Sequence, residues 1–398
     1  MSTYYKILPE DLICRGFQYH EGLNIDINII DEDECSYGLH FADKKHILGF
    51  CNYGSVIAEV ELPEDAVVYH FDNKSKADKI ILKNLRPLWN TDTIEALIRE
   101  GVDIESCENL MLYESAKNGC FDIVEYLIEY GADVHARDDY ALKQASLKGN
   151  LEVVKCLVEH GADIHARDDY ALQAASENGY LEIVKYLIEH GSDIHANDDE
   201  SLRLSSEYGY LNVVKYLVEQ GADIHACDDF ALGVASYGDH LDVIKYLVEQ
   251  GVDIHANNDY ALRQASENGH LDVVKCLVMQ GADIHALDDY ALRWASNNGY
   301  FDIVKYLVEQ GANIHADDDY ALRWASNHGY LNTMKYLVEQ GANIHASDDV
   351  ALCWASQNGH LEAVKYLVKQ GANVHASDDY AIRCAKTPEI RAYLKSVK

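Results

Sequence analysis

The chain is short of the residues and motifs on which many functions depend. Its 398 residues include only four prolines, and none lies between Pro87 and Pro388. No apolar run approaches the ~18 residues that a membrane-spanning helix needs. The opening stretch MSTYYKILPEDLICRGF lacks the charged and apolar regions of a secretory signal. We therefore expect a cytoplasmic protein without a membrane partner, whose helices proline does not interrupt.

Basic residues are scarce. Lys and Arg number 33 against 67 Asp and Glu, which gives a formal charge of −34. Binding to nucleic acid or to an anionic membrane surface requires a basic footprint. We therefore expect neither kind of partner.

The motifs of metal, cofactor and nucleotide sites are missing as well. The ten cysteines are scattered singly with no CxxC pair, a pattern that favours free thiols over disulfides or a zinc site. Neither phosphate-binding loop, GxxxxGKS/T or GxGxxG, occurs in the chain. We expect no bound metal and no cofactor.

A 30-residue repeat dominates the chain. The pattern Gly-x-Asp/Asn-Ile/Val recurs ten times from Gly101 to Gly371, always 30 residues apart. A fixed period of this length predicts a stacked solenoid, because a lone helix pair cannot bury both of its faces. We expect an imperfect first unit over residues 80–109, nine complete repeats over 110–379, and a C-terminal capping repeat over 380–398.

One repeat, residues 290–319, predicts two helices. YALRWASNNG carries a narrow apolar stripe, and YFDIVKYLVEQG carries a stronger one with helical spacing. Asp289 stands where an N-cap belongs and is expected to pair with Arg293 four residues later. Gly299 and Gly311 are expected to end the two helices.

The repeat is similar to a known signature. GYFDIVKYLVEQGANIHA resembles the ankyrin pattern G-H-x-x-I/V-V-x-x-L-L-x-x-G-A-D-V-N-A, and YALRWAS stands where that family has T-P-L-H-x-A-A. The resemblance covers roughly residues 80–398 and implies a mostly α solenoid of helix pairs. The period is 30 rather than the family's usual 33, and the missing residues fall where the family builds its β-hairpin finger, so we expect blunt turns. Tyr290 and Arg293 stand in place of the Thr and His of T-P-L-H, so the Thr–His hydrogen bonds of that family are not expected here.

The strict repeat length suggests a narrower resemblance. Thirty-residue units behind a segment reading GFQYHEGLN resemble the large ankyrin-repeat families of giant amoeba-infecting viruses. This resemblance implies a viral protein in the host cytoplasm, or one carried in the virion.

Residues 1–79 form a different kind of domain. Short alternating apolar runs (YYKIL, GFQYH, GLHF, SVIAEVEL and AVVYHF) predict strands, and Asp43–Phe50 predicts a helix, so we expect a small α+β domain. Five residues there could in principle assemble a Cys–His nucleophile, although no local signature supports it and structural roles are the favoured interpretation. They are Cys35, His40, Cys51, His20 and His70.

Two polar ladders run through the repeats. A histidine recurs nine times from His135 to His375, and an aspartate doublet recurs from Asp138-Asp139 to Asp378-Asp379, with Asn258-Asp259 as its one variant. Repeats stack ~10 Å apart, too far for neighbouring histidines to share a zinc ion at ~2 Å bonds. We expect the histidines to hydrogen-bond the turns, and the doublets to cap helices and form an acidic ridge.

Three tryptophans are candidates for partner binding. Trp294, Trp324 and Trp354 occupy the same first-helix position in consecutive repeats, where other repeats have Gln, Ala, Leu or Val, and Arg293 and Arg323 lie beside two of them. Tryptophan and arginine are enriched in binding hot spots. Packing between neighbouring first helices is the competing interpretation.

Two adjacent repeats deviate from the pattern. In the repeat 200–229, Glu200 replaces the tyrosine and Ser201 and Ser205 replace two alanines. In the repeat 230–259, Gly233 lies inside a predicted helix, which costs ~1 kcal/mol relative to alanine, and the terminating glycine moves from position 239 to Gly238. We expect bending or opening of the solenoid to start within residues 200–260.

The favoured function is a monomeric, non-enzymatic scaffold that binds a protein on its concave face, and the viral resemblance implies that this protein belongs to the host. Two alternatives remain open: an enzyme within residues 1–79 that the repeats direct to its substrate, and a structural component of a virion.

Overall fold

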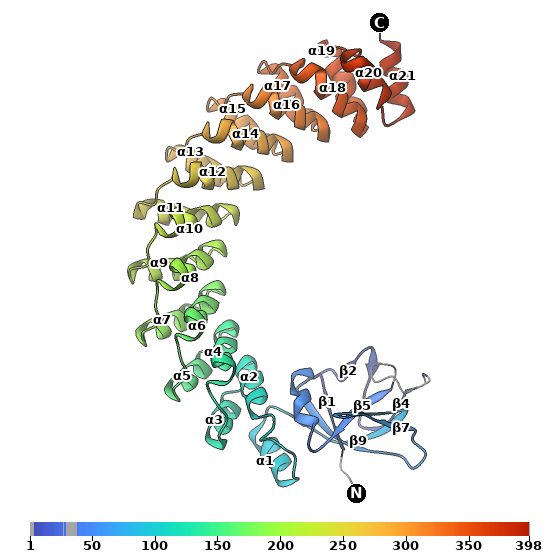
Figure 1. The fold of residues 1–398 in the computed structure, drawn as a ribbon, viewed down its shortest axis with the longest axis vertical. Coiled ribbons are helices and arrows are strands. Elements are labelled where there is room, and N and C mark those ends of the chain that lie inside the picture. Colours follow the sequence, from blue (N-terminus) through green and yellow to red (C-terminus); the bar gives the residue numbers. More distant parts are fainter. Residues whose placement is uncertain (1–3, 27, 29–37, 398) are drawn as a thin grey trace. The chain divides into compact units, whose positions relative to one another are not determined.

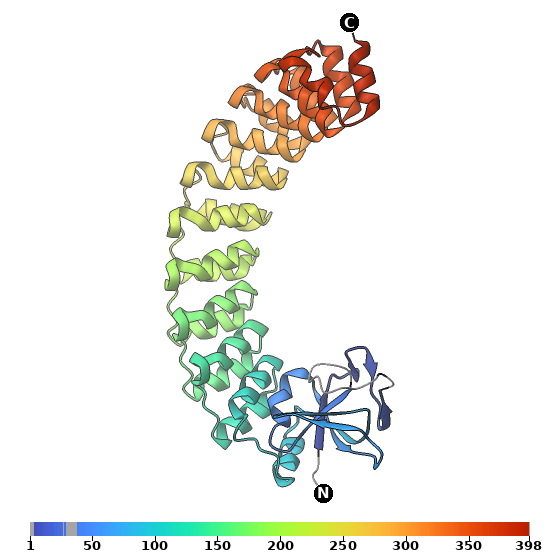
Figure 2. The same ribbon diagram turned by 45° about the vertical axis from the view of Figure 1, so that its right-hand side comes forward.

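The computed structural model describes residues 4–26, 28 and 38–397. The chain divides into two compact units, residues 1–193 and 194–398, called here the N-terminal half and the C-terminal half (Figure 1). The N-terminal half begins with a strand-rich domain and continues into helix pairs, whereas the C-terminal half consists of helix pairs (Figure 2). The expected mostly α repeat fold with a strand-rich N-terminal region is therefore confirmed.

The strand-rich domain is built on a seven-stranded antiparallel sheet with strand order β4-β9-β6-β1-β5-β8-β7. A separate hairpin of β2 and β3 lies outside that sheet. The strands are β1 (Tyr4–Leu8), β2 (Ile13–Cys14), β3 (Phe17–Gln18), β4 (Gly22–Ile25), β5 (Leu39–Asp43), β6 (Val56–Glu61), β7 (Val68–His70), β8 (Ser75–Ala77) and β9 (Lys79–Pro87).

Two expectations for this domain need correction. The predicted helix Asp43–Phe50 is a 3-10 helix, η1 (Ile47–Tyr53). The expected boundary after residue 79 falls inside β9, which pairs with β4 and β6, so residues 80–87 belong to the sheet rather than to a first repeat. Ile80 and Leu82 are fully buried while Lys83 is exposed. This alternation has the period of a strand rather than that of a helix.

The first helix, α1 (Thr91–Arg99), is fixed to the sheet through Glu100. Asn90 begins the helix by accepting a hydrogen bond from the Thr93 amide at 3.1 Å. Arg86 of β9 holds both carboxylate oxygens of Glu100, at 3.0 and 3.2 Å, and the Tyr5 hydroxyl donates to the same carboxylate at 2.8 Å. A bidentate, charge-assisted pair of this kind orients both partners.

The remaining helices alternate between first and second helices of each repeat. In the N-terminal half they are α2 (Glu108–Asn118), α3 (Phe121–Tyr130), α4 (Ala136–Lys148), α5 (Leu151–Glu159), α6 (Ala166–Glu177) and α7 (Leu181–Glu189). In the C-terminal half they are α8 (Ala196–Glu207), α9 (Leu211–Glu219), α10 (Ala226–Tyr237), α11 (Leu241–Gln250), α12 (Ala256–Asn268), α13 (Leu271–Met279), α14 (Ala286–Asn298), α15 (Phe301–Glu309), α16 (Ala316–His328), α17 (Leu331–Glu339), α18 (Ala346–Asn358), α19 (Leu361–Gln370), α20 (Ala376–Arg383) and α21 (Pro388–Ser396). Even-numbered helices are the first helices of their repeats.

Burial follows the predicted stripes. In the repeat 290–319, Leu292 of the first helix is fully buried, and Ile303, Val304 and Leu307 of the second helix are at most 1% exposed. Gly299 ends its helix with a left-handed backbone, at φ +80°. The leucine equivalent to Leu292 is at most 2% exposed in all eight repeats that carry it: Leu142, Leu172, Leu202, Leu232, Leu262, Leu292, Leu322 and Leu352.

The first turn of each first helix from α4 onward, within the bounds given above, has a left-handed backbone over three residues. Leu287, Asp288 and Asp289 have φ angles of 50°, 57° and 53°, and the equivalent residues of the other repeats match them. A left-handed backbone costs most residues roughly 1–2 kcal/mol, and Asp and Asn tolerate it best because their short polar side chains bond locally. The doublet therefore suits the turn that it builds.

The second aspartate of each doublet bonds to the next repeat. Asp289 is 3% exposed, and its Oδ1 accepts the Asn313 amide at 2.7 Å and lies 3.1 Å from Nδ1 of His285. We call this series the buried-aspartate ladder; its bonds are 2.7–2.9 Å long. Its acceptors are Asp139, Asp169, Asp199, Asp229, Asp259, Asp289, Asp319 and Asp349.

The expected roles of Asp289 as an N-cap and as the partner of Arg293 are therefore wrong. The guanidinium of Arg293 donates to the carbonyl oxygens of Asp288 and Leu287, at 2.8 and 2.9 Å, and to the carboxylate of Asp317, 24 residues later, at 3.1 Å. The carboxylate of Asp289, which was expected to cap the helix that follows it, accepts the Asn313 amide instead.

Gly233 has a packing role that its low helix propensity does not reveal. A Cβ atom at this position would lie 2.4 Å from Cδ1 of Tyr260, whose ring stacks on Phe230 at a centroid distance of 5.7 Å. The glycine therefore makes room for the tyrosine of the next repeat. Asp239 stands where other repeats have the glycine that ends the first helix, and it has the same left-handed backbone, with φ +64°. Whether residues 200–260 open first stays a prediction.

Replacing Asp289 with alanine should destabilise the array, because the Asn313 amide would lose its buried acceptor. We expect the free energy of unfolding to fall by about 1–3 kcal/mol more than in Asp288→Ala. Asp288 is exposed and shares the left-handed backbone, so it is the matched control. Asp289→Asn should stay close to the wild type, because the amide oxygen of Asn109 already accepts the Asp133 amide at 2.9 Å. Urea unfolding measures the difference, and equal losses in the two alanine variants would contradict the ladder's role.

Replacing Gly233 with alanine should destabilise the protein despite alanine's higher helix propensity. Overpacking against Tyr260 is expected to cost about 1–3 kcal/mol, against a propensity gain of ~1 kcal/mol. Tyr260→Val introduces the side chain that Val350 already has at the same repeat position. This change should remove the clash, so that the double variant is more stable than the sum of the single changes predicts. A stabilised Gly233→Ala protein would show that the ring moves aside without cost.

Candidate functional site

The three candidate tryptophans lie on successive first helices of the C-terminal half. Trp294 is on α14, Trp324 on α16 and Trp354 on α18, and each is partly exposed. These even-numbered helices form one row, on the inner side of the bend within this half (Figure 1). The rings of Trp324 and Trp354 are 5.2 Å apart between centroids, at an interplanar angle of 59°. We call Trp294, Trp324 and Trp354 the tryptophan row.

Each of the first two indoles is also positioned by a tyrosine one turn earlier in its own helix. The centroid of Trp294 lies 5.5 Å from that of Tyr290, and Trp324 lies 5.6 Å from Tyr320. Aromatic pairs at this distance are held in place by packing and by their ring quadrupoles. The tryptophan row is therefore pre-organised, and two of its three rings, those of Trp324 and Trp354, contact each other.

The two candidate arginines are tied into the array. The side chains of Arg293 and Arg323 are each 15% exposed. The guanidinium of Arg293 lies 6.0 Å from the ring centroid of Tyr290 and 5.1 Å from that of Tyr320, and Arg323 lies 5.8 Å from Tyr320. The contact between Arg293 and Tyr320 links neighbouring repeats, whereas the other two contacts lie within one helix. The indoles are thus better placed than the arginines to contact a partner.

His328 belongs to the same surface, although the sequence patterns did not single it out. Its ring stacks on Trp324 at a centroid distance of 5.7 Å and an angle of 26°, and the Tyr330 ring stacks on His328 at 5.6 Å. The sequence could have pointed to His328, because other repeats have Asn, Lys, Tyr or Gly at its position.

The histidine ladder has the structural role expected of it. In each repeat from His135 to His375, Nδ1 of the histidine lies 2.6–3.2 Å from the aspartate four residues later. Within the described part of the chain, no three His, Cys, Asp or Glu side chains gather closely enough to hold a metal ion.

The proposed Cys–His nucleophile receives little support. Cys35 lies outside the described residues. Cys51 is 1% exposed, and burial raises the pKa of its thiol to about 12, which keeps it protonated and unreactive. Nδ1 of His70 lies 2.8 Å from the Ser75 hydroxyl, and Nδ1 of His20 lies 3.0 Å from the Glu21 carbonyl oxygen.

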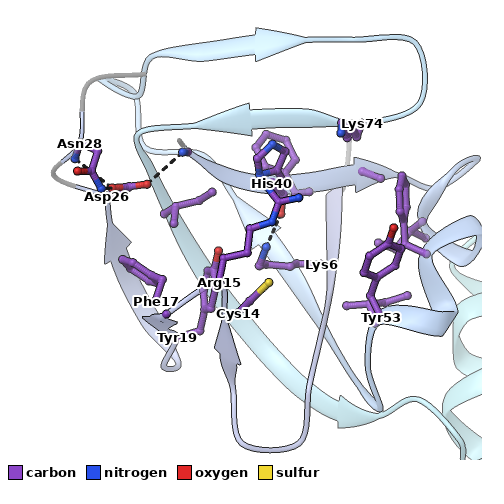
Figure 3. A pocket seen from close by; sticks show the side chains of 18 residues that line it. Lys6, Cys14, Arg15, Phe17, Tyr19, Asp26, Asn28, His40, Tyr53 and Lys74 are labelled. Atoms are coloured by element: carbon purple, nitrogen blue, oxygen red, sulfur yellow. Dashed lines mark hydrogen bonds between the residues drawn. The ribbon is translucent and has the colours of Figure 1, made fainter. Parts of the chain in front are cut away.

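The strand-rich domain contains a cavity of ≈570 Å³ beside β1 and β5 (Figure 3). Lys6, Arg15 and Lys74 contribute cationic groups to its lining. The Lys6 side chain is almost fully buried; its Nζ donates to the His40 carbonyl oxygen at 2.5 Å and lies 4.5 Å from the centroid of the Tyr19 ring. Burial lowers the pKa of Lys6 to about 8. Sequence patterns did not reveal this site because its residues come from segments spread between Lys6 and Lys74.

Comparison with known proteins identifies the repeats. The family profile described as ankyrin repeats in three copies matches residues 142–228, 202–288 and 292–378, and a second ankyrin-repeat profile matches 112–158. The chain belongs to the ankyrin-repeat family. Residues 2–90 match a domain of unknown function, DUF7666, which agrees with the extension of the sheet beyond residue 79.

Relatives of this ankyrin-repeat protein occur in a giant virus. A protein of Acanthamoeba polyphaga mimivirus named as an ankyrin repeat protein is 32% identical over 131 residues, which cover 31% of this chain and 64% of that protein. An uncharacterized protein of the same virus is 35% identical over 131 residues, covering 31% of this chain and 95% of its own length. The resemblance to the ankyrin-repeat families of amoeba-infecting viruses is therefore confirmed, while the chain spans less than two thirds of the first of these relatives.

In the described part of this ankyrin-repeat protein, every helix is too short or too polar to cross a lipid bilayer.

Replacing Lys6 with methionine should stabilise the protein at neutral pH. The pKa of Lys6 is about 8 in the folded protein, against 10.5 for an unperturbed lysine. The folded protein therefore holds the ammonium form at a cost below pH 8, and this cost disappears as the pH approaches 10.5. We expect Lys6→Met to raise the free energy of unfolding by up to about 3 kcal/mol at pH 7, at ~1.4 kcal/mol per pKa unit, and this gain to shrink above pH 8.

Chemical unfolding at pH 7, 9 and 10.5 measures this gain. Lys83→Met is the matched control, because Lys83 is half-exposed and pairs with Glu61 on the surface. It should change the free energy of unfolding by less than about 1 kcal/mol. A Lys6→Met protein less stable than the wild type at pH 7 would mean that the ammonium group is not destabilising in the fold.

Proposed function

We propose that this ankyrin-repeat protein is a non-enzymatic scaffold that binds another protein through the tryptophan row. Ankyrin repeats generally mediate protein–protein interaction, which gives the proposal its starting point. The observation that carries it is the alignment of Trp294, Trp324 and Trp354, three partly exposed indoles at one position of three consecutive repeats. Large aromatic side chains held in one place contribute contact area at little entropic cost.

Arg293 and Arg323 precede Trp294 and Trp324 in the chain and belong to the proposed surface. Their guanidinium groups pack against Tyr290 and Tyr320, so we assign them to the support of the tryptophan row more than to direct contact. Because Arg293 links two repeats through Tyr320, its replacement would loosen the positions of the indoles as well as remove charge.

The chemistry of the chain narrows the class of partner. A net charge of −34 favours a neutral or basic protein surface and disfavours nucleic acid. Because relatives occur in a virus of amoebae, we propose a protein of the host as the partner and the host cytoplasm as the place of action. We further propose that the protein acts as a monomer without a metal or cofactor, and a structural role in the virion is the alternative.

The experiment compares the wild type with a triple variant, Trp294→Gln/Trp324→Gln/Trp354→Gln. Glutamine already stands at this position in two other repeats, as Gln144 and Gln264, so the fold should tolerate it. Partners captured from amoebal lysate are identified and purified, and the affinity of each is measured by calorimetry. We expect the triple variant to bind the partner at least tenfold more weakly, since a hot-spot residue contributes about 2 kcal/mol or more.

A second triple variant provides the matched control. Tyr306, Tyr336 and Tyr366 occupy equivalent positions on the second helices α15, α17 and α19, and their replacement by leucine should leave the affinity unchanged. Unchanged binding in the tryptophan variant would overturn the proposed surface. Ordered self-assembly of the purified protein in mass photometry would favour the virion alternative over the scaffold.

A further inference from the structure

The tryptophan row lies on segments of the chain that contain no acidic residue. Residues 290–300, 320–330 and 350–360 read YALRWASNNGY, YALRWASNHGY and VALCWASQNGH, whereas the equivalent segments 170–180, 200–210 and 260–270 each contain glutamate. The acidic residues nearest in sequence lie in the turns before these helices. The polar side chains beside the indoles are mainly amides, all at least partly exposed: Asn297, Asn298, Asn327, Gln357 and Asn358. Within an acidic chain, this surface therefore suits an uncharged ligand.

The three indoles also offer unused hydrogen-bond donors. In the part of the chain that the structure describes, no acceptor pairs with the N–H group of Trp294, Trp324 or Trp354, and none of these groups is among the buried polar atoms that lack a partner. The indole N–H groups are therefore open to solvent. A partner that covers them must supply acceptors, because a donor that is buried without an acceptor is costly.

The spacing of the repeats favours one backbone conformation in that partner. Neighbouring helices stack about 8–10 Å apart. A polyproline II helix has three residues per turn and a rise of ~3.1 Å, so that it repeats every ~9.3 Å, whereas an α-helix repeats every ~5.4 Å and a strand every ~6.7 Å. Polyproline II makes no internal hydrogen bonds, which leaves its carbonyl oxygens available as acceptors. A segment in this conformation that crosses α14, α16 and α18 thus meets each repeat once per turn.

The aromatic rings form two separate platforms along this path. Trp294 packs on Tyr290, with 5.5 Å between the ring centroids, and Trp324 packs on Trp354 at 5.2 Å. Among the described residues, no ring contact joins Trp294 to Trp324. Two platforms on neighbouring repeats suit two flat proline rings that are three residues apart, because aromatic-lined grooves recognise proline-rich segments in this way.

We propose that the tryptophan row binds a proline-rich segment of the partner protein in the polyproline II conformation. Prolines three residues apart pack on the two platforms, and carbonyl oxygens of the segment accept hydrogen bonds from the indole N–H groups. This inference rests on the proposed function, which it narrows from a protein partner to one class of segment. A preformed, extended segment also loses little conformational entropy when it binds.

The first test titrates the full chain with three probes and follows the indole N–H signals by NMR. The probes are a nonaproline peptide, a nine-residue Gly/Ser peptide and cellohexaose. We expect nonaproline to bind at least tenfold more tightly than either of the others and to shift the signals of Trp294, Trp324 and Trp354. The signal of Trp89, which lies in the N-terminal half, is the internal control and should not move.

Each contrary result has one meaning. No shift at 5 mM nonaproline, or equal binding of the Gly/Ser peptide, would overturn the proposal. Tighter binding of cellohexaose would assign the row to a polysaccharide and would overturn it as well.

The second test examines the spacing with two alanine-based peptides of equal composition. Both have eleven residues and three prolines, placed at every third position in one peptide and at every second position in the other. We expect the first peptide to bind at least threefold more tightly, because only its prolines recur with the turn of a polyproline II helix. Equal affinities would contradict the match between the segment and the repeats.

Variants locate the binding of nonaproline. The triple variant Trp294→Gln/Trp324→Gln/Trp354→Gln should bind it at least fivefold more weakly, whereas Tyr306→Leu/Tyr336→Leu/Tyr366→Leu should bind it as the wild type does. Trp324→Phe keeps an aromatic ring but removes the N–H donor, and it should weaken binding at least twofold. Unchanged affinity in the triple tryptophan variant or in Trp324→Phe overturns the proposal.

The outcomes separate this inference from the proposed function. If the triple tryptophan variant loses affinity for a captured partner but nonaproline does not bind the wild type, the scaffold function stands and the proline-rich segment is wrong. If the triple variant keeps its affinity for the partner, the proposed function itself fails at this surface.

Discussion

One hydrogen bond, repeated along the array, constrains the spacing of the repeats. The buried carboxylate of Asp289 accepts the Asn313 amide 24 residues later, and the same bond recurs from repeat to repeat. A buried carboxylate that loses a hydrogen-bond donor is costly, so the donor and the acceptor must stay in register. An insertion or deletion between them would separate the two groups, which constrains 24 of the 30 residues of each period. The buried aspartate lies in a left-handed turn. This turn explains why the residue before it, such as Asp288, is an aspartate or an asparagine.

The sequence predicted what depends on local periodicity. The apolar stripes located the helix pairs and their buried faces, and glycines located the ends of helices, because both signals lie within a few residues of the structure that they specify. The role of Asp289 was misassigned for the opposite reason. A helix cap and an acceptor for the next repeat require the same residue at the same position, and only the fold shows which donor approaches it. The β9 strand was missed because the repeat period, counted back from Gly101, placed residues 80–87 in a helix pair.

The candidate sites differ in how far the sequence could reveal them. The tryptophan row was visible because the repeat aligns Trp294, Trp324 and Trp354 in the chain, and the repeat also aligns them in space. The cavity was invisible because Lys6, Arg15 and Lys74 have no common spacing and are brought together only by pairing of distant strands. Arg293 is an intermediate case: the sequence located it, but its contact with Tyr320 depends on the neighbouring repeat.

Variation among the repeats becomes informative once the constraints between them are known. Gly233 looks like a defect within its own helix, but the ring of Tyr260 in the next repeat requires it. The position of Trp294 is different, since Gln, Ala, Leu and Val replace tryptophan there without loss of the repeat's helices or ladder bonds. The helices and the ladder bonds therefore do not require tryptophan at this position. This tolerance is one reason for proposing the tryptophan row as a partner surface, although Trp324 and Trp354 also pack against each other.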